Sequence, residues 1–324
     1  MASKKTAKYK KKAQKKIMKA IFGKALPIAM IIVILLSVAF NYFYNSNESF
    51  RDFVDDIFTS EVTTQRPFID PEGSEMAVHF IDVGQGDSTL FQTPEGSILV
   101  DCGEKEYGDD VVAYLNAQGV YELEYFIITH PDSDHMGCAA YVLENITVKN
   151  FIMNGQEKTT QFFEKAIDVL EEKQIDTDVV APGDVITLGA LQISVLGPHR
   201  LNFSEAEWNN ASLILLATYG HRSFLLTGDA EEEGEADLME HFGDSLKCDV
   251  FSAGHHGSKT SNSQEILEAA QPTYVVVSCG KDNSYGHPHQ EALDVFASVG
   301  TTVYRTDELG SIVFVTNGEN LEKR

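Results

Sequence analysis

Residues 129–137 read THPDSDHMG and directly follow the apolar residues 126–128. Two histidines and two aspartates fall within six residues of this stretch: His130, Asp132, Asp134 and His135. A polar turn needs only residues such as Asp and Ser, and a single histidine is more often an ordinary polar side chain than a ligand. Two histidines interleaved with two carboxylates at the end of a strand can instead reach two adjacent metal ions. The stretch therefore predicts a metal site.

Strand and helix patterns surround this loop. Short β-rich runs separated by turn residues are expected at 77–83, 88–92, 97–100, 125–129, 150–153, 185–196, 212–218, 223–227, 249–253, 274–278, 302–305 and 311–315. Helices are expected at 109–117, 137–143, 159–173, 230–241, 263–270 and 291–297. Two β-rich blocks, each followed by helices, predict an α/β fold in which two packed sheets are covered by helices on both faces.

The loop resembles the His-x-His-x-Asp-His signature of the metallo-β-lactamase superfamily, with Asp132 in place of the second histidine. This variant resembles the soluble C-terminal domain of ComEC-type competence proteins. Six further segments resemble that branch in the same order: FIDVGQGDS (80–88), ILVDCG (98–103), NNASL (209–213), LLTGD (225–229), GHHGSKTS (254–261) and YGHP (285–288). The resemblance covers residues 76–315. It implies the αββα sandwich of the metallo-β-lactamase fold. The hydrolase domain with this fold is expected at about 76–320.

The resemblance also implies roles for single residues in a site for two divalent metal ions, Zn²⁺ or Mn²⁺. His130 and Asp132 would hold the first ion. Asp134, His135 and His255 would hold the second ion, and Asp134 is also expected to take part in catalysis. Asp229 would bridge both ions, and Asp101 would orient the metal-binding loop as a further catalytic residue.

The sequence departs from the family pattern at the third ligand of the first ion. Other branches have a further histidine where this chain has Asn209 and Asn210. The carbonyl oxygen of Asn210, the imidazole of His256 or a water molecule could take that place. Carboxylate and amide oxygens in place of imidazole shift the preference from Zn²⁺ towards Mn²⁺.

Further residues are expected to contact the substrate. Gln85 and Asp87 lie in a glycine-flanked turn that faces the site in the resembling branch, although a hairpin with polar tips would look the same. His256 and Ser258 would contact the substrate, and Lys259 would assist the leaving group. His287 would either assist the leaving group as an acid or serve as an outer metal ligand. For Ser258 and Lys259, a helix cap and a solvated lysine explain the residues almost as well.

The N-terminal part of the chain predicts a membrane anchor. Residues 1–24 hold ten lysines and no acidic residue, and residues 25–44 pass without a charge, which is about one bilayer's worth of helix. The positive-inside tendency places the lysine-rich tail in the cytoplasm. Residues 45–75 read as a polar stalk, so the hydrolase domain would lie outside the cell. The small residues 37–39 leave a cleaved signal peptide open, and the domain would then be secreted.

The charge balance of the chain bears on its partners. It has 25 basic and 49 acidic side chains, and removing the ten lysines of the tail leaves 15 bases against the same 49 acids, a net charge of −34. Such a surface repels polyanions at long range, so no stable nucleic-acid complex is expected.

The expected activity is hydrolysis of a phosphodiester, because the resembling branch is thought to degrade one DNA strand during uptake. Water bridging two metal ions would supply hydroxide at neutral pH. A second hypothesis is a hydrolase of a choline or teichoic-acid phosphodiester in the cell envelope. A third is a noncatalytic envelope protein that binds metal only for structure.

Overall fold

The computed structural model describes residues 75–200, 203 and 205–324. The predicted basic tail, membrane anchor and almost all of the stalk lie outside the described residues, so these three assignments stay predictions. Within the described ranges, no helix combines the length and the apolar character that a membrane span needs.

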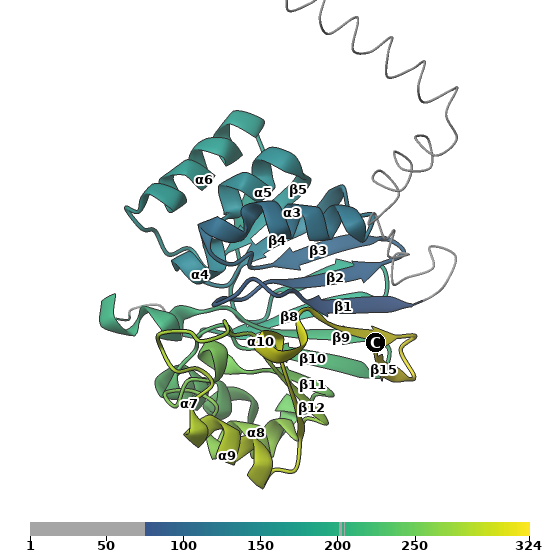
Figure 1. Ribbon diagram of the computed structural model, residues 1–324, viewed down its shortest axis with the longest axis vertical. Coiled ribbons are helices and arrows are strands. Elements are labelled where there is room, and N and C mark those ends of the chain that lie inside the picture. Colours follow the sequence, from purple (N-terminus) through teal and green to yellow (C-terminus); the bar gives the residue numbers. More distant parts are fainter. Residues whose placement is uncertain (1–74, 201–202, 204) are drawn as a thin grey trace, which may run out of the picture. The chain divides into compact units, whose positions relative to one another are not determined.

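Two β-sheets form the centre of the described domain, and they lie face to face (Figure 1). The first sheet has the order β15-β14-β1-β2-β3-β4-β5-β6, and the second has the order β13-β12-β11-β10-β9-β8-β7. The strands of the first sheet are β1 (Met76–Phe80), β2 (Thr89–Thr93), β3 (Gly96–Val100), β4 (Glu122–Ile128), β5 (Thr147–Met153), β6 (Asp176–Val179), β14 (Ile312–Thr316) and β15 (Leu321–Lys323). Those of the second sheet are β7 (Val185–Leu188), β8 (Leu191–Gly197), β9 (Ile214–Tyr219), β10 (Arg222–Leu226), β11 (Val250–Ser252), β12 (Tyr274–Val277) and β13 (Thr302–Arg305).

Helices cover the outer face of each sheet (Figure 1). The first sheet carries α3 (Gly108–Ala117), α5 (Ala139–Asn145) and α6 (Gln161–Lys173). The second sheet carries α7 (Glu232–Phe242), α8 (Gln264–Ala270) and α9 (Gln290–Ser298). The short helices α4 (Ser133–Met136) and α10 (Thr306–Leu309) complete the domain. The layers run helix, sheet, sheet, helix, as the sequence predicts.

The space between the sheets is filled by apolar side chains from both of them. Phe314 of β14 makes edge contacts with Phe80 of the same sheet and with Phe224 of the opposite sheet, at ring-centroid distances of 6.3 and 6.4 Å. All three rings are fully buried, and each contributes about 1.5–3 kcal/mol of hydrophobic stabilisation. Strand β1 is buried along its whole length because α3 covers its other face, where His79 contacts Tyr114.

The strand ends decide where polar side chains gather. β3 pairs in parallel with β4, and β10 pairs in parallel with β11, so the carboxyl ends of each pair open at the same edge. Asp101 follows β3, the THPDSDHMG loop follows β4, Asp229 follows β10, and the segment 254–261 follows β11. Segments that are far apart in the sequence therefore meet at one end of the sandwich, where open α/β sheets commonly bind ligands.

Candidate metal centre

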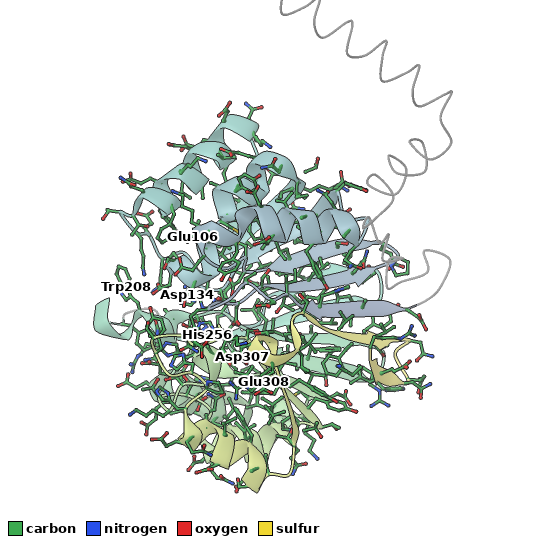
Figure 2. The ribbon with its side chains drawn as sticks, viewed as in Figure 1. Glu106, Asp134, Trp208, His256, Asp307 and Glu308 are labelled. Atoms are coloured by element: carbon green, nitrogen blue, oxygen red, sulfur yellow. The ribbon has the colours of Figure 1, made fainter. Side chains whose placement is uncertain are left out.

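The carboxylate of Asp229 lies at the centre of the residues that the sequence predicts as ligands. Asp229 is buried, and its Oδ1 and Oδ2 atoms face two different groups of side chains. Asp134 and His256, which belong to one of these groups, lie close to the junction of the two sheets in Figure 2.

The group around Asp229 Oδ2 contains two imidazole nitrogens and a carboxylate. Nε2 of His130 lies 3.8 Å from Oδ2, and Nε2 of His255 lies 3.7 Å from it. Asp132 Oδ1 lies 3.9 Å from His130 Nε2. One oxygen of Asp229 therefore lies beside His130 and His255, and Asp132 lies beside His130.

The group around Asp229 Oδ1 has the same composition. Nε2 of His135 lies 3.0 Å from Oδ1, and Nε2 of His256 lies 3.7 Å from it. Asp134 Oδ2 lies 3.1 Å from His256 Nε2. A single carboxylate thus separates two pairs of histidines, each with an aspartate beside it. The buried Asp87 joins His135, His256 and Asp229 in a group whose ligand atoms all lie within 4.8 Å of one another.

The two histidines of the THPDSDHMG loop, His130 and His135, each form a hydrogen bond through Nδ1, on the side of the ring away from Asp229. His135 Nδ1 donates to Asp101 Oδ2 at 2.9 Å, and this contact turns its Nε2 towards Asp229. The Thr129 hydroxyl donates to the same Asp101 oxygen at 2.7 Å, which leaves the Thr129 oxygen to accept from His130 Nδ1 at 3.2 Å. Asp101 therefore holds the His135 ring directly and the His130 ring through Thr129.

The other two histidines are held in the same way. His256 Nδ1 donates to the Ser278 carbonyl at 3.0 Å, and His255 Nδ1 lies 3.2 Å from Glu231 Oε1. Glu231 was not predicted from the sequence. Such partners behind a metal-binding histidine fix its tautomer and direct the other nitrogen to the ion.

Several polar atoms in the centre have no hydrogen-bond partner among the described residues and could instead bind a cation. Among the described residues, His130 Nε2, His135 Nε2 and Asp229 Oδ1 are buried without a hydrogen-bond partner. Burial would raise the pKa of the Asp229 carboxyl, but the neighbouring His135 and His256 hold it well below its usual range. Burial, reinforced by the neighbouring His135, lowers the pKa of His130. Buried, unpaired ligand atoms around an ionised carboxylate suit divalent metal ions.

The two adjacent histidines stand in the reverse of the expected order. The sequence placed His255 with Asp134 and His135, but His256 lies with those residues and His255 lies with the first group. Both residues have left-handed backbone conformations, with φ values of 49° and 56°. This turn directs two successive side chains into one site, which an extended strand or a regular helix does not do.

Asn210 is engaged away from the metal groups. Its Oδ1 accepts hydrogen bonds of 2.9 Å from the backbone N–H groups of both Glu231 and Gly234, at the start of α7. The oxygen that was expected to bind the first ion therefore accepts from the start of the helix, and His255 is the residue that lies with His130 in the first group.

Ser258 and Lys259 also lie differently from the expectation. The Thr260 hydroxyl donates to Glu231 Oε1 at 2.9 Å, so the Ser258 hydroxyl donates to Thr260 Oγ1 at 2.9 Å. The Ser258 proton is thus used inside the network behind His255. Lys259 is exposed, and its backbone N–H donates to His289 Nδ1 at 3.1 Å.

The glycine-flanked turn does face the centre, as the sequence predicts. The Asp87 N–H donates to the Asp134 carbonyl at 3.1 Å, and Asp87 Oδ1 lies 3.7 Å from His256 Nδ1. A Cβ atom on Gly86 would lie 2.3 Å from the Asp134 carbonyl oxygen. Glycine at this position lets the turn pack directly on the metal loop.

Gln85 and His287 meet beside the centre. Gln85 Nε2 lies 3.4 Å from His287 Nδ1, and the His287 ring lies 5.5 Å from the ring of His255. Burial and the nearby charges of His256 and His255 lower the pKa of His287 to about 4. His287 is therefore positioned to contact a molecule bound at the centre.

Lys158 is a neighbour of the centre that was not predicted. Its ammonium group forms an ion pair with Asp132 and lies 5.4 Å from the ring of Trp208, which is labelled in Figure 2 at the same end of the domain. Lys158 follows β5, which pairs in parallel with β4. The loop after β5 ends beside the loop after β4, so this position in the sheet is the feature that could have pointed to Lys158.

Comparisons with known proteins agree with this geometry. The profile of the metallo-β-lactamase superfamily matches residues 81–281. The chain is 36% identical to ComE operon protein 3 of Bacillus subtilis over 74% of its own length and 33% of the relative. It is 32% identical to the competence protein ComA of Neisseria gonorrhoeae, over 77% of the chain and 33% of the relative. The chain thus matches about a third of the length of each of these relatives, which confirm the resemblance to ComEC-type competence proteins.

A solved structure shows the same fold. The metallo-β-lactamase fold protein YhfI from Bacillus subtilis superposes with a TM-score of 0.51 at 17% identity, over 75% of this chain and 99% of that protein. At this identity the similarity bears on the fold alone. The profile match, the two-sheet architecture and the histidine and aspartate centre together establish that the chain belongs to the metallo-β-lactamase superfamily of metal-dependent hydrolases.

Proposed function

We propose that this protein is a phosphodiesterase that works with two divalent metal ions, Zn²⁺ or Mn²⁺. One observation carries the proposal. Four histidines present Nε2 to the two oxygens of Asp229, and an oxygen atom holds Nδ1 of every one of them. A noncatalytic site for structural metal would be closed by protein ligands, whereas two ions around one carboxylate leave positions for water and substrate.

The residues divide into two ligand sets in this proposal. His130, Asp132 and His255 would hold the first ion, and Asp134, His135 and His256 the second, with Asp229 shared between them. When bound, the ions lower the pKa of water and draw negative charge from a phosphoryl oxygen. Three carboxylates among seven ligands make the donor set harder than an all-imidazole site, which suits Mn²⁺ as well as Zn²⁺.

A phosphodiester is favoured over a neutral substrate by the groups around the two ions. Lys158 brings a positive charge to the rim of the first ligand set, where a phosphate oxygen would bind. The relative from Neisseria gonorrhoeae is named a competence protein, and the resemblance to the ComEC-type branch implies action on DNA. DNA is therefore the first substrate to test, and the activity of the whole relatives is not implied.

A second candidate substrate is a small phosphodiester of the cell envelope. The observation in its favour is the charge of −34 outside the lysine-rich tail, which opposes the approach of a long polyanion. A small zwitterionic choline phosphodiester meets less repulsion than DNA does.

Turnover by the metal-loaded full chain in detergent tests the proposal. Single-stranded DNA, double-stranded DNA, bis(p-nitrophenyl) phosphate and a choline phosphodiester are compared with Zn²⁺ and with Mn²⁺. We expect metal-dependent cleavage of at least one phosphodiester, loss of that cleavage in Asp229→Ala, and normal cleavage in the surface control Asp110→Asn. No turnover of any of the four substrates with either metal, in a protein that binds two ions, would reject the proposal.

We also propose that residues 25–44 anchor the protein in the cell membrane, with the hydrolase domain outside. The support is the uncharged span between ten lysines and a polar segment. Protease added to intact cells is expected to digest the domain and to spare the lysine-rich tail. Secretion of a shortened protein would favour the signal peptide instead, and full protection would reject both.

A further inference from the structure

His287 differs from the four histidines around Asp229 in the group that faces its Nδ1 atom. Those four nitrogens meet oxygen acceptors, whereas His287 Nδ1 meets the side-chain nitrogen of Gln85 at 3.4 Å. We propose that Gln85 is a positioning residue that keeps the His287 proton on Nε2, so that His287 donates a hydrogen bond to the substrate phosphate and is not a metal ligand. This inference rests on the proposed phosphodiesterase function.

The orientation of the Gln85 amide follows from its other partner. The backbone N–H of Gly280 can only donate, and it lies 3.2 Å from Gln85 Oε1. The amide oxygen must therefore face Gly280, and the NH₂ group must face His287. A proton on His287 Nδ1 would then point at another donor, so the arrangement favours the tautomer with the proton on Nε2.

The backbone around His287 keeps this contact in place. Asn283 Oδ1 accepts from the His287 N–H at 3.0 Å, and Asn283 Nδ2 donates to the His287 carbonyl at 2.6 Å. The same Nδ2 donates to the Gly280 carbonyl at 2.8 Å. Gly280 also packs closely on the turn, since a Cβ there would lie 2.8 Å from the Gln85 backbone nitrogen. Gln85 and His287 are thus joined through one short loop.

The tautomer decides what His287 can do. An imidazole that holds its only proton on Nε2 would become an imidazolate if it gave that proton away, so His287 does not protonate the leaving oxygen. During hydrolysis, the oxygen of water bonds to phosphorus and releases a proton to solvent, the bond from phosphorus to the leaving oxygen breaks, and that oxygen takes a proton from solvent. The Nε2–H group donates a hydrogen bond to the oxygen that gains charge in this step, which a fixed donor stabilises strongly.

Nitrogen NMR of the full chain, labelled with ¹⁵N-histidine and loaded with diamagnetic Zn²⁺, tests the tautomer without any turnover. The His287 signals are identified by their loss in His287→Gln. We expect a protonated Nε2 and a bare Nδ1 in the native protein. Gln85→Glu replaces the donor by an acceptor and should move the proton to Nδ1, whereas the surface control Gln192→Glu should not. A bare Nε2 in the native protein, or an unchanged pattern in Gln85→Glu, would overturn the inference.

Kinetics with bis(p-nitrophenyl) phosphate then test the consequence. Gln85→Glu should lower kcat by about 10²-fold, the usual effect of losing one such donor, with a much smaller change in KM. His287→Gln retains an N–H donor and should keep more activity than His287→Ala. Equal losses in these two variants would argue against a donor role. If NMR finds the expected tautomer but no phosphodiester is cleaved, the proposed function fails and the assignment of Gln85 stands.

Discussion

Asp101 Oδ2 accepts a hydrogen bond of 2.9 Å from His135 Nδ1 and thereby turns Nε2 of this histidine towards Asp229. Asp101 has a left-handed backbone with a φ of 57°, which Asn tolerates well. Asp101→Asn should therefore fold and should weaken metal binding by about 10–100-fold, because partners behind a ligand histidine have effects of this size. Titration of the metal-free protein with Zn²⁺ measures the change.

The exposed Asp110 on α3 provides the matched control, since Asp110→Asn removes the same charge at a distance from the centre. An Asp101→Asn protein with the affinity of the control would show that Asp101 does not orient the ring.

Asp229 should be the residue whose loss removes both ions. Its two oxygens face separate groups of candidate ligands, so Asp229→Ala takes one ligand from each set and leaves four histidines around a gap. We expect elemental analysis to find fewer than two metal ions per chain and turnover to fall to background. Two retained ions with normal turnover would remove Asp229 from the centre.

The order of the layers and most strands follows from local sequence patterns. Strands β9 to β13 and helices α7 to α9 lie where the sequence patterns predict them, whereas the single run expected at 185–196 is the hairpin of β7 and β8. The edge strands β6 and β15 were missed because the four β6 side chains are all exposed and β15 is a three-residue polar strand, so neither has the apolar pattern of a buried strand. The segment Ser133–Met136 was expected as a loop and is the short helix α4.

The ligands could be predicted as residue types, but their grouping could not. His255 and His256 are adjacent, and only their left-handed backbone reveals which group each one joins. Lys158 and Glu231 carry no motif, and they reach the centre because β5 and α7 lie beside it. Such contacts come from the pairing of strands that are distant in the sequence.

Lys158 should have opposite effects on metal and substrate. Its ammonium group pairs with Asp132 and repels a cation at the first ligand set, so Lys158→Met should tighten metal binding there, by about tenfold. The same change should raise KM for bis(p-nitrophenyl) phosphate, because a positive charge near the phosphate is lost. Lys165→Met, which removes the partner of Glu144 on the surface, is the control. Weaker metal binding in Lys158→Met would show that the lysine supports the ion instead.

His79 should make the stability of the domain sensitive to mild acid. Burial lowers its pKa to about 3, against about 6.5 in the unfolded chain. The stabilisation from neutral His79 is complete above pH 6.5 and is lost as the pH falls from 6.5 towards 3, by about 1.4 kcal/mol per pH unit. The free energy of unfolding is measured with urea, in the presence of a chelator, at pH 7.5 and at pH 5. Its decrease between the two pH values should be about 2 kcal/mol smaller in His79→Gln than in the native protein. Equal losses in both proteins would show that His79 does not carry this pH dependence.

The salt dependence of DNA binding should separate a nuclease from an envelope hydrolase. A nuclease with a basic groove loses affinity steeply as salt rises, because phosphate contacts release counterions. The chain carries a net charge of −34 outside its lysine-rich tail, and the screening length is about 10 Å at 0.1 M salt. If DNA is the substrate, its apparent affinity at saturating metal should therefore weaken little, or improve, between low and moderate salt.

The matched measurement uses a choline phosphodiester, a small zwitterion whose KM should hardly respond to salt. Single-stranded DNA and this compound are compared under the same metal and the same salt series, so that any effect of salt on the metal centre appears in both. A steep loss on DNA alone would mean that the 15 basic side chains outside the tail gather into a groove and would favour a dedicated nuclease. Rapid turnover of the choline compound without DNA cleavage would assign the centre to the cell envelope, because charge repulsion excludes DNA while the two ligand sets remain active.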